Sequence, residues 1–413
     1  MPVRATKRGA ERTPIGGDFD VLICGASFAG LAVARELRAT RARVLVLDRY
    51  EIGERQTSAC AAPTEWLRNL GLEAAIRQTF GSLLVHTPHA EARWPLGWTF
   101  STFDYRELCA LLWEQAGGSC EFETAKVEGR AGTSTAGIEG VRTDRGIVRA
   151  PVVVDALGWK RILGSSQVQP PEARLSRGLE VHPGGSGEDL ELWIDRDVIR
   201  AGYGWSFPAS DELRVGVGSF DPHDHVKQPT VALADELGLP PDGYQGNWIP
   251  HKLRPAVGDG IFFAGDSAGH CLPLTAEGIR TAFYFGIACG RELRAVLEGR
   301  RSRAEALERY GRFSDSHRRK FELMLKAQHA VPRLHPRALG AVARAFRRGS
   351  VSHWAFGHYL RIAPPEYALP APPPAARQSR ALRPPTYDMR SATNASPTTN
   401  HSRPRTSRPA PTS

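Results

Sequence analysis

Residues 19–31 read Phe19-Asp20-Val21-Leu22-Ile23-Cys24-Gly25-Ala26-Ser27-Phe28-Ala29-Gly30-Leu31, and this stretch decides the fold. Its apolar run ends in a glycine turn, a helix is predicted from Phe28 to Ala39, and a second buried strand follows over residues 43–48. Gly25 allows the tight turn, Gly30 lets the helix pack close to the strand, and the helix N-terminus presents free N–H groups to a pyrophosphate. The stretch predicts a βαβ dinucleotide-binding unit, and an ordinary strand–turn–helix is the alternative.

Three residues beside the turn are further candidates for dinucleotide contacts. Asp48 lies 23 residues after Gly25, where an acidic side chain would bind a ribose hydroxyl. Arg49 follows it directly. Ser27 takes the place of the middle glycine of the usual pattern and is small enough to keep the backbone near the phosphate.

The composition, 413 residues with 41% hydrophobic and 24% charged, is that of a globular protein with a sizeable core. Residues 1–17 contain no apolar signal region, and no run reaches the roughly 18 apolar residues of a membrane span, so we expect a cytoplasmic protein. Six cysteines without a CxxC pair predict neither a disulfide framework nor a metal site. The net charge of +10 is concentrated near the C-terminus, where residues 294–349 carry 15 Lys and Arg against 5 Asp and Glu.

Later segments indicate two kinds of sheet. Residues 152–158 and 260–270 contain short apolar runs that end in small residues, as buried parallel strands do. Residues 178–220 alternate apolar and polar positions, which is typical of a half-exposed antiparallel sheet. Such a sheet could form one wall of a substrate chamber.

Five separated motifs carry a resemblance to a known family. They are Gly25-Ala-Ser-Phe-Ala-Gly30, Arg106 within Asp104-Tyr-Arg-Glu-Leu108, Asp155-Ala-Leu-Gly158, Gly202-Tyr-Gly-Trp-Ser-Phe-Pro208, and Ala264-Gly-Asp-Ser-Ala-Gly269 followed by Pro273-Leu-Thr-Ala-Glu-Gly-Ile279. Over residues 18–295 the chain resembles the geranylgeranyl reductase family, FAD-dependent oxidoreductases with the p-hydroxybenzoate hydroxylase type of fold. The sequence departs from the family pattern at Ser27, Ala209 and Ala276, which replace a glycine, a frequent lysine and a glycine.

The resemblance implies an α/β fold: a Rossmann-like FAD-binding domain, an interleaved antiparallel-sheet substrate domain and a helical C-terminal part. The expected segments are a flexible N-terminus (1–17), FAD-binding domain (18–81, 104–165 and 256–297), substrate domain (82–103 and 166–255), C-terminal helices (298–363) and a disordered, basic, Pro-rich tail (364–413). A helix from about Glu277 to Leu297 would aim its N-terminus at the flavin ring, where negative charge accumulates on reduction.

The resemblance also implies roles for individual residues. The expected FAD-binding residues are Gly25, Ser27, Gly30, Asp48, Arg49, Arg106, Asp155, Gly265, Asp266 and Gly278. Tyr203, Trp205, Phe207 and Pro208 match the pattern that lines the prenyl channel, although aromatic residues that simply fill a sheet core are the alternative. The candidate catalytic residues are Cys60, Tyr203 and Trp205, since a thiol beside an apolar pocket can act as a weak acid.

These implications favour reduction of isoprenoid carbon–carbon double bonds by hydride transfer from reduced FAD, with NADPH or a ferredoxin-like protein as the reductant. The alternative is an FAD-dependent monooxygenase that hydroxylates a small apolar or aromatic substrate. Halogenation is disfavoured, because the related halogenases use a lysine in the first third of the chain and none occurs here between Lys7 and Lys126.

The basic C-terminal part has two interpretations. Arg337, Arg344, Arg347 and Arg348 share a candidate helix with apolar residues, which would suit peripheral docking on an anionic membrane. The other is that the apolar face packs on the FAD-binding domain while the arginines are solvated. Nucleic-acid binding is not expected, because no zinc, helix-turn-helix or RNP pattern accompanies the charge.

Overall fold

The predicted βαβ unit is present at the centre of a six-stranded sheet. β1 (Val21–Cys24) is fully buried, α1 (Phe28–Leu37) follows it, and β2 (Val44–Asp48) pairs with β1 in parallel. The strand order is β18-β19-β12-β1-β2-β6. The computed structural model describes residues 13–56, 58–134, 137–164 and 175–370.

The other strands of this sheet come from distant parts of the chain. β6 (Cys120–Thr124), β12 (Val152–Asp155) and β19 (Ile261–Phe263) are parallel to their neighbours, and β18 (Val257–Gly258) is an antiparallel edge. Small antiparallel strands form the connection between β6 and β12; they are β7 (Val127–Arg130), β8 (Thr133–Ser134), β9 (Gly137–Ile138), β10 (Val141–Thr143) and β11 (Gly146–Val148). The helices α1, α3 (Tyr105–Ala116) and α5 (Ile279–Leu297) pack together beside the sheet.

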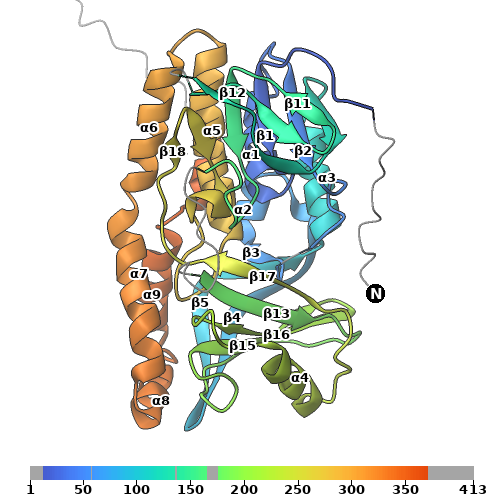
Figure 1. Cartoon of the computed structure of the whole chain (residues 1–413). Coiled ribbons are helices and arrows are strands. Elements are labelled where there is room, and N and C mark those ends of the chain that lie inside the picture. The colour runs from blue at the N-terminus through green and yellow to red at the C-terminus, as the bar shows by residue number, and fades with distance from the viewer. Residues whose placement is uncertain (1–12, 57, 135–136, 165–174, 371–413) are drawn as a thin grey trace, which may run out of the picture. The chain divides into compact units, whose positions relative to one another are not determined.

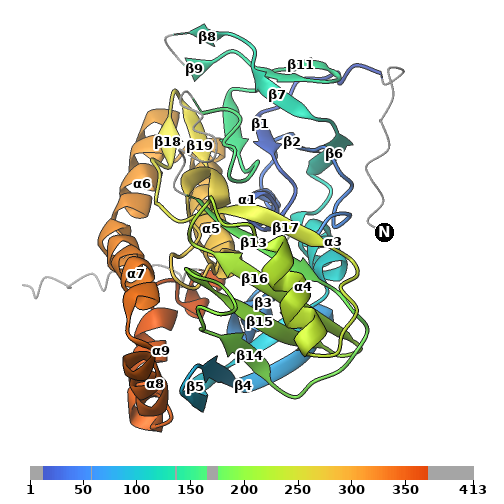
Figure 2. The same cartoon turned by 60° about the horizontal axis from the view of Figure 1, so that its bottom comes forward.

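A second sheet of eight strands has the order β17-β13-β16-β15-β14-β4-β5-β3. Its strands are β3 (Ala61–Pro63), β4 (Ile76–Thr87), β5 (Ala90–Phe103), β13 (Leu175–Val181), β14 (Leu190–Trp193), β15 (Gly202–Ala209), β16 (Glu212–Ser219) and β17 (Gln245–Pro250). All of its pairings are antiparallel except that of β14 with β4. Figures 1 and 2 show this sheet below the parallel one, with α4 (Lys227–Glu236) against β13 and β16.

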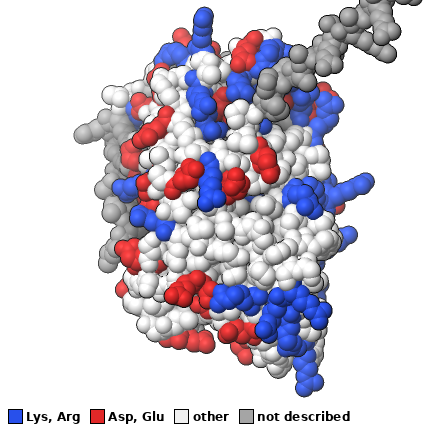
Figure 3. All heavy atoms as spheres, turned by 180° about the vertical axis from the view of Figure 1, so that it is seen from behind, with Lys and Arg blue, Asp and Glu red and all other residues white. Residues whose placement is uncertain are grey.

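The C-terminal helices run along one side of both sheets (Figure 1). They are α6 (Arg303–Asp315), α7 (Arg318–Ala330), α8 (Pro336–Ala345) and α9 (Gly349–Leu360), and α8 and α9 both pack against β5. Figure 3 shows Lys and Arg side chains gathered at the end of the molecule that holds α8 and α9. Among the helices of the described residues, none combines the length and apolar character needed to cross a membrane.

Two domain boundaries differ from the prediction. The second sheet takes β3 and the start of β4 from the segment 18–81, because both pair with β5. The tail was predicted to begin at residue 364, yet η4 (Pro365–Ala368) packs against α2 (Thr64–Asn69). Trp66 Nε1 donates to the carbonyl of Ala363 at 3.0 Å, and Asn69 Nδ2 donates to that of Pro365 at 3.1 Å. The expectations for residues 1–12 and 371–413 lie outside the described residues.

Candidate active site

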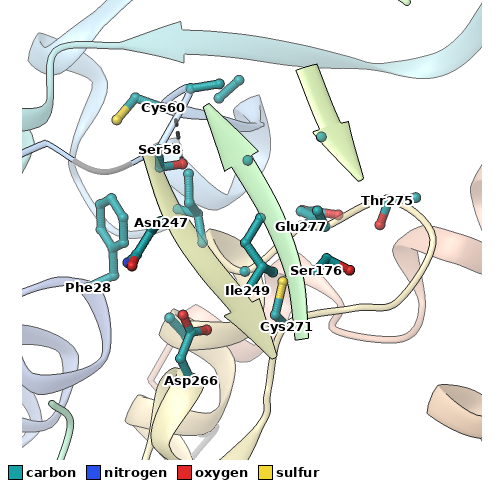
Figure 4. Close-up of a pocket in the computed structure, with 18 of the residues that line it drawn as sticks. Phe28, Ser58, Cys60, Ser176, Asn247, Ile249, Asp266, Cys271, Thr275 and Glu277 are labelled. Atoms are coloured by element: carbon teal, nitrogen blue, oxygen red, sulfur yellow. Dashed lines mark hydrogen bonds between the residues drawn. The ribbon is translucent and has the colours of Figure 1, made fainter. Parts of the chain in front are cut away.

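A cavity of about 870 Å³ lies where the two sheets and the C-terminal helices meet. On the side of the parallel sheet it is lined mainly by polar and small residues, which include Ala26, Ser27, Asp48, Arg49, Gly265 and Asp266, together with the ring of Phe28. On the side of the eight-stranded sheet and the helices it is lined by Trp94, Leu96, Trp98, Phe100, Leu339, Phe346 and Phe356. Figure 4 shows Phe28, Cys60, Asn247 and Asp266 around this cavity. It therefore joins a polar region to a large apolar one.

The turn after β1 has the geometry that a pyrophosphate site requires. Gly25 has φ +111°, and a Cβ there would lie 2.2 Å from the carbonyl oxygen of Ala156. A Cβ at Gly30 would lie 1.8 Å from the Gly25 oxygen, so only glycine lets α1 approach the turn this closely. Ser27 has φ −114°, which an L-residue adopts without strain, and its Oγ accepts a hydrogen bond from Tyr105 Oη at 3.2 Å. The replacement of the middle glycine therefore leaves the turn intact.

Asp48 is hydrogen-bonded to the same turn. Its Oδ2 accepts the N–H of Ala26 at 2.8 Å and its Oδ1 accepts that of Tyr50 at 3.1 Å. Burial raises the pKa of Asp48, while these two N–H groups oppose the rise. Arg49 is exposed and its guanidinium lies 4.7 Å from the centre of the Tyr50 ring. Both Asp48 and Arg49 line the cavity.

Asp266 and the N-terminus of α5 meet at the cavity. The predicted helix begins two residues later than expected, at Ile279, with Gly278 as its N-cap. Gly265, Asp266, Gly278 and Ile279 all line the cavity. Among the described residues no group donates a hydrogen bond to the Asp266 carboxylate, and burial, opposed by the charge of Arg254, raises its pKa to about 6. A half-buried carboxylate that lines the cavity without a donor fits a ligand that carries hydroxyl groups.

Four expected cofactor residues do not line the cavity: Gly25 and Gly30, which shape the turn after β1, and Asp155 and Arg106. The carboxylate of Asp155 is fully buried: Oδ1 accepts from Ser267 Oγ at 2.7 Å and from the N–H of Leu157 at 3.0 Å, and Oδ2 accepts the N–H of Leu163 at 2.8 Å. Its role is to join the end of β12 to the Gly265–Ala268 turn. Arg106 is exposed on α3, and its backbone rather than its guanidinium packs on the loop at Gly53. Neither the Asp155 nor the Arg106 side chain is among those that line the cavity.

The aromatic residues of β15 share one face of the sheet, and Pro208 lies on the other. Tyr203, Trp205 and Phe207 line the cavity, whereas Pro208 does not. Successive side chains of a strand point to opposite faces, so a residue adjacent to Phe207 cannot share its wall. The carbonyl of Pro208 accepts a hydrogen bond from Thr102 Oγ1 at 2.8 Å instead. The expectation that Pro208 binds substrate is corrected accordingly.

The three candidate catalytic side chains share the cavity but differ in what they can donate. Cys60 is buried with φ +50°, and burial raises the pKa of its thiol well above the usual value, so the sulfur keeps its proton. Tyr203 Oη already donates to the Thr275 carbonyl at 2.8 Å. Trp205 Nε1 donates to Glu180 Oε2 at 3.2 Å.

Several lining residues were missed by the sequence analysis. Glu180, Gln245 and Asn247 come from β13 and β17, and α7 to α9 contribute Met324, Leu339, Phe346, Phe356 and Tyr359. The alternation of apolar and polar residues around residue 180 predicted a strand, but it did not predict which face of that strand lines a cavity. The aromatic residues 94–100 were the one visible signal for the β5 wall.

Comparison with known proteins agrees with this architecture, although no family model matches the chain. Digeranylgeranylglycerophospholipid reductase 3 of Methanosphaera stadtmanae is 24% identical over 337 residues, which cover 73% of this chain and 83% of the relative. Reductase 2 of the same organism is 22% identical over 80% of this chain and 92% of its own length. This chain is therefore similar in sequence to digeranylgeranylglycerophospholipid reductases over most of its length. The chloroplastic geranylgeranyl diphosphate reductase of Arabidopsis thaliana is 30% identical over 119 residues, or 27% of this chain and 25% of the relative.

Solved structures show the same fold. A geranylgeranyl bacteriochlorophyll reductase-like protein from Thermoplasma acidophilum superposes with a TM-score of 0.74 and 17% identity, over 85% of this chain and 97% of that one. PqsL from Pseudomonas aeruginosa, described as a probable FAD-dependent monooxygenase, gives a TM-score of 0.62 at 19% identity, over 79% and 99%. The predicted α/β fold, the resemblance to geranylgeranyl reductases and the class of FAD-dependent oxidoreductases are confirmed.

Proposed function

We propose that this protein uses reduced FAD to saturate carbon–carbon double bonds of an isoprenoid substrate. The observation that carries the proposal is the continuity of the cavity, which runs from a dinucleotide-type turn to a chamber lined by aromatic and aliphatic side chains. A long apolar chain is best buried by such walls. The names of the homologues support the same class of substrate.

The residues at the polar side of the cavity fit FAD. The turn at Gly25 and the N-terminus of α1 would hold the pyrophosphate, and Asp48 would bind the adenosine ribose. The donor-free Asp266 carboxylate would accept from a ribityl hydroxyl. The N-terminus of α5 would place partial positive charge near the flavin ring. When bound and reduced, the cofactor supplies the hydride that adds to one alkene carbon.

The residues of the chamber would position the alkene and keep water away. An unactivated double bond is a poor hydride acceptor, so it has to be held against the flavin in a dry site. Tyr203, Trp205 and Phe207 would form one wall, and Cys60 would present a neutral thiol that can protonate the second carbon. Tyr203 is the weaker donor candidate, because its hydroxyl proton is already bonded to Thr275.

The C-terminal helices support peripheral docking on an anionic membrane as part of this proposal. Residues 316–361 carry ten Lys and Arg against a single acidic residue, Glu322. Leu334 and Val342 are 37% and 43% exposed and also line the cavity, so they mark its opening. Leu323 on α7 and Trp354 on α9 add further exposed apolar surface, with exposures of 70% and 66%. Apolar side chains at a basic opening would let a lipid-borne isoprenoid enter directly.

The test of the proposal is an anaerobic single-turnover experiment. The protein is purified, FAD is identified from its visible spectrum and photoreduced, and a geranylgeranyl compound or menaquinone is added. Flavin reoxidation without oxygen, with a gain of two mass units per saturated double bond, is the expected result. Flavin that stays reduced until oxygen and a ligand are added, and then passes through a hydroperoxide-like transient, would identify a monooxygenase instead. NADPH and a reduced ferredoxin are compared as reductants in the same apparatus.

A matched pair of variants tests which face of β15 binds the substrate. F207A removes a wall of the chamber, and we expect the Kd of the isoprenoid to rise about 10-fold or more, since burying a Phe side chain is worth about 1.5–3 kcal/mol. P208A changes the neighbouring residue on the opposite face and should leave the Kd within about threefold. Equal effects of the two substitutions would contradict the assignment of this wall.

A further inference from the structure

Three polar side chains of the eight-stranded sheet form a hydrogen-bonded row that ends at the cavity. His182 Nε2 lies 3.0 Å from Glu180 Oε1, and His182 Nδ1 lies 3.2 Å from Glu212 Oε1. The exposed fractions of the side chains are 5% for Glu180, 12% for His182 and 37% for Glu212, so the row leads from partly exposed to buried surroundings.

The inner end of the row is held at the cavity wall. Glu180 lines the cavity, and its Oε2 accepts the indole N–H of Trp205 at 3.2 Å. Gln245 Nε2 lies 3.2 Å from Glu180 Oε1 and also contacts His182. Since Trp205 and Gln245 line the cavity as well, the carboxylate lies among the side chains that would surround the substrate.

The middle of the row carries a proton at neutral pH. Burial lowers the pKa of His182, but its hydrogen bonds and charge interactions with Glu180 and Glu212 outweigh burial and raise the pKa to about 9. Glu212 is kept ionised, because His182 and Arg214 together overcome its burial and lower its pKa to about 2. Among the described residues, these two carboxylates are the charged groups paired directly with His182, and Arg214 acts through Glu212 at 2.9 Å.

Alkene reduction consumes a proton that a closed apolar chamber cannot supply by itself. Saturating one double bond adds a hydride, with its electron pair from the reduced flavin, to one carbon and a proton to the other. Whether the Cys60 thiol or a cavity water gives that proton, the donor is left as an anion and has to be re-protonated before the next turnover.

We propose that the His182–Glu180 pair is the proton source of the cavity, an inference that rests on the proposed reductase function. His182 Nε2–H transfers its proton to Glu180 Oε1, and the Glu180 carboxyl passes it to the anion left in the chamber. The neutral imidazole, whose side chain is 12% exposed, then regains a proton from solvent at Nε2. Glu212 is a positioning residue, since it holds His182 in place and favours the imidazolium.

The activity test compares E180Q and H182Q with a control pair of the same kind. His86 Nε2 lies 2.7 Å from Glu191 Oε2 in the same sheet, and neither residue lines the cavity. In anaerobic multiple-turnover assays we expect E180Q and H182Q to slow product formation by about 10²-fold, the usual worth of a positioned acid, with an unchanged substrate Kd. H86Q should stay within about twofold. An E180Q rate within about twofold of the wild type would overturn the inference.

The pH profile separates proton supply from a purely structural role. The wild-type rate should be constant at neutral pH and fall as His182 deprotonates near pH 9. E212Q removes one carboxylate from the imidazolium, so the fall should move to lower pH. A wild-type profile without this fall, or an E212Q profile unshifted from it, would contradict the proposal.

The third readout needs no turnover and therefore distinguishes failure of the relay from failure of the proposed function. His182 is titrated by NMR in the full-length protein without substrate, with H182Q used to assign its signal. We expect a midpoint near pH 9 that moves down in E180Q. If no isoprenoid is reduced but this titration is found, the reductase assignment fails while the charged pair stands. A wild-type midpoint near the ordinary histidine value of about 6.5 would contradict the proposed proton transfer from His182 to Glu180, even if the enzyme reduces isoprenoids.

Discussion

Replacement of Arg280 should release the C-terminal segment from the cavity wall. The Arg280 side chain is fully buried at the start of α5, and its Nε and Nη2 donate to the two oxygens of Glu277 at 2.8 Å each. Its Nη1 donates to the carbonyls of Tyr359, Leu360 and Ala363 at 3.2, 2.9 and 3.3 Å. Tyr359 Oη also donates to Glu277 and lines the cavity. This one guanidinium therefore joins the N-terminus of α5 to the end of α9.

The expected loss of stability follows from the buried group that R280L leaves unpaired. The variant strands the Glu277 carboxylate, which is 7% exposed, without its cation, and removing one partner of a buried ion pair costs about 3–5 kcal/mol. The loss should appear in urea unfolding as a lower free energy of unfolding, and in hydrogen exchange as faster labelling of residues 359–369. R318L breaks an exposed pair with Asp315, 42% and 55% exposed, and should cost at most about 1 kcal/mol.

The double variant E277L/R280L tests the reasoning most directly. If the cost of R280L comes from an unpaired buried charge, removal of both charges should recover most of the lost stability. A loss below about 1 kcal/mol in R280L would show that the pair does not stabilise this junction, and a double variant no more stable than R280L would show that the cost does not come from an unpaired charge.

Three further predictions concern the cofactor turn, Asp266 and the helices. G30A should abolish FAD retention, because the added Cβ would lie 1.8 Å from the Gly25 oxygen. S27G should keep the Kd of FAD within about threefold, since the backbone at Ser27 is unstrained. Fluorescence titration with FAD measures both effects. Burial raises the pKa of Asp266 to about 6. The stabilising contribution of this group to the cofactor-free protein is therefore present below about pH 4 and is lost as the pH rises through 6. D266N should remove this pH dependence of the unfolding midpoint. W354A should weaken sedimentation with phosphatidylglycerol vesicles, and high salt should weaken it for the wild type as well; equal binding to neutral phosphatidylcholine vesicles would contradict docking through charge.

Local patterns were enough to predict the parts of the molecule that depend on neighbouring residues. Gly30 is required by a contact within one βαβ unit and Gly25 by its own φ of +111°, so both were visible in the sequence. Period-two alternation placed Tyr203, Trp205 and Phe207 on one face of a strand. The same rule, applied one residue further, would have moved Pro208 to the other face.

Other features depended on chain segments that are far apart in sequence. The Asp155 carboxylate bonds to Ser267, which is 112 residues away, and this long-range contact takes it out of the cavity. Glu180 becomes a wall residue only because β13 pairs with β16 and β17 beside the chamber. Leu339 and Phe346 line the cavity because the helix α8 packs on β5. From the sequence, the apolar face of this helix could equally have docked on a membrane or packed against the rest of the protein.

The sequence by itself determined the glycine turn after β1, the class of fold and the aromatic face of β15, because each follows from steric demands or periodicity within a short segment. Only the tertiary structure decided which faces are covered, which carboxylates reach the cavity and that the C-terminal helices complete it. Those outcomes depend on pairing and packing between elements that are far apart in the sequence, by 112 residues for Asp155 and Ser267 and by 297 for Trp66 and Ala363, and no local pattern encodes which distant surface a given side chain will meet.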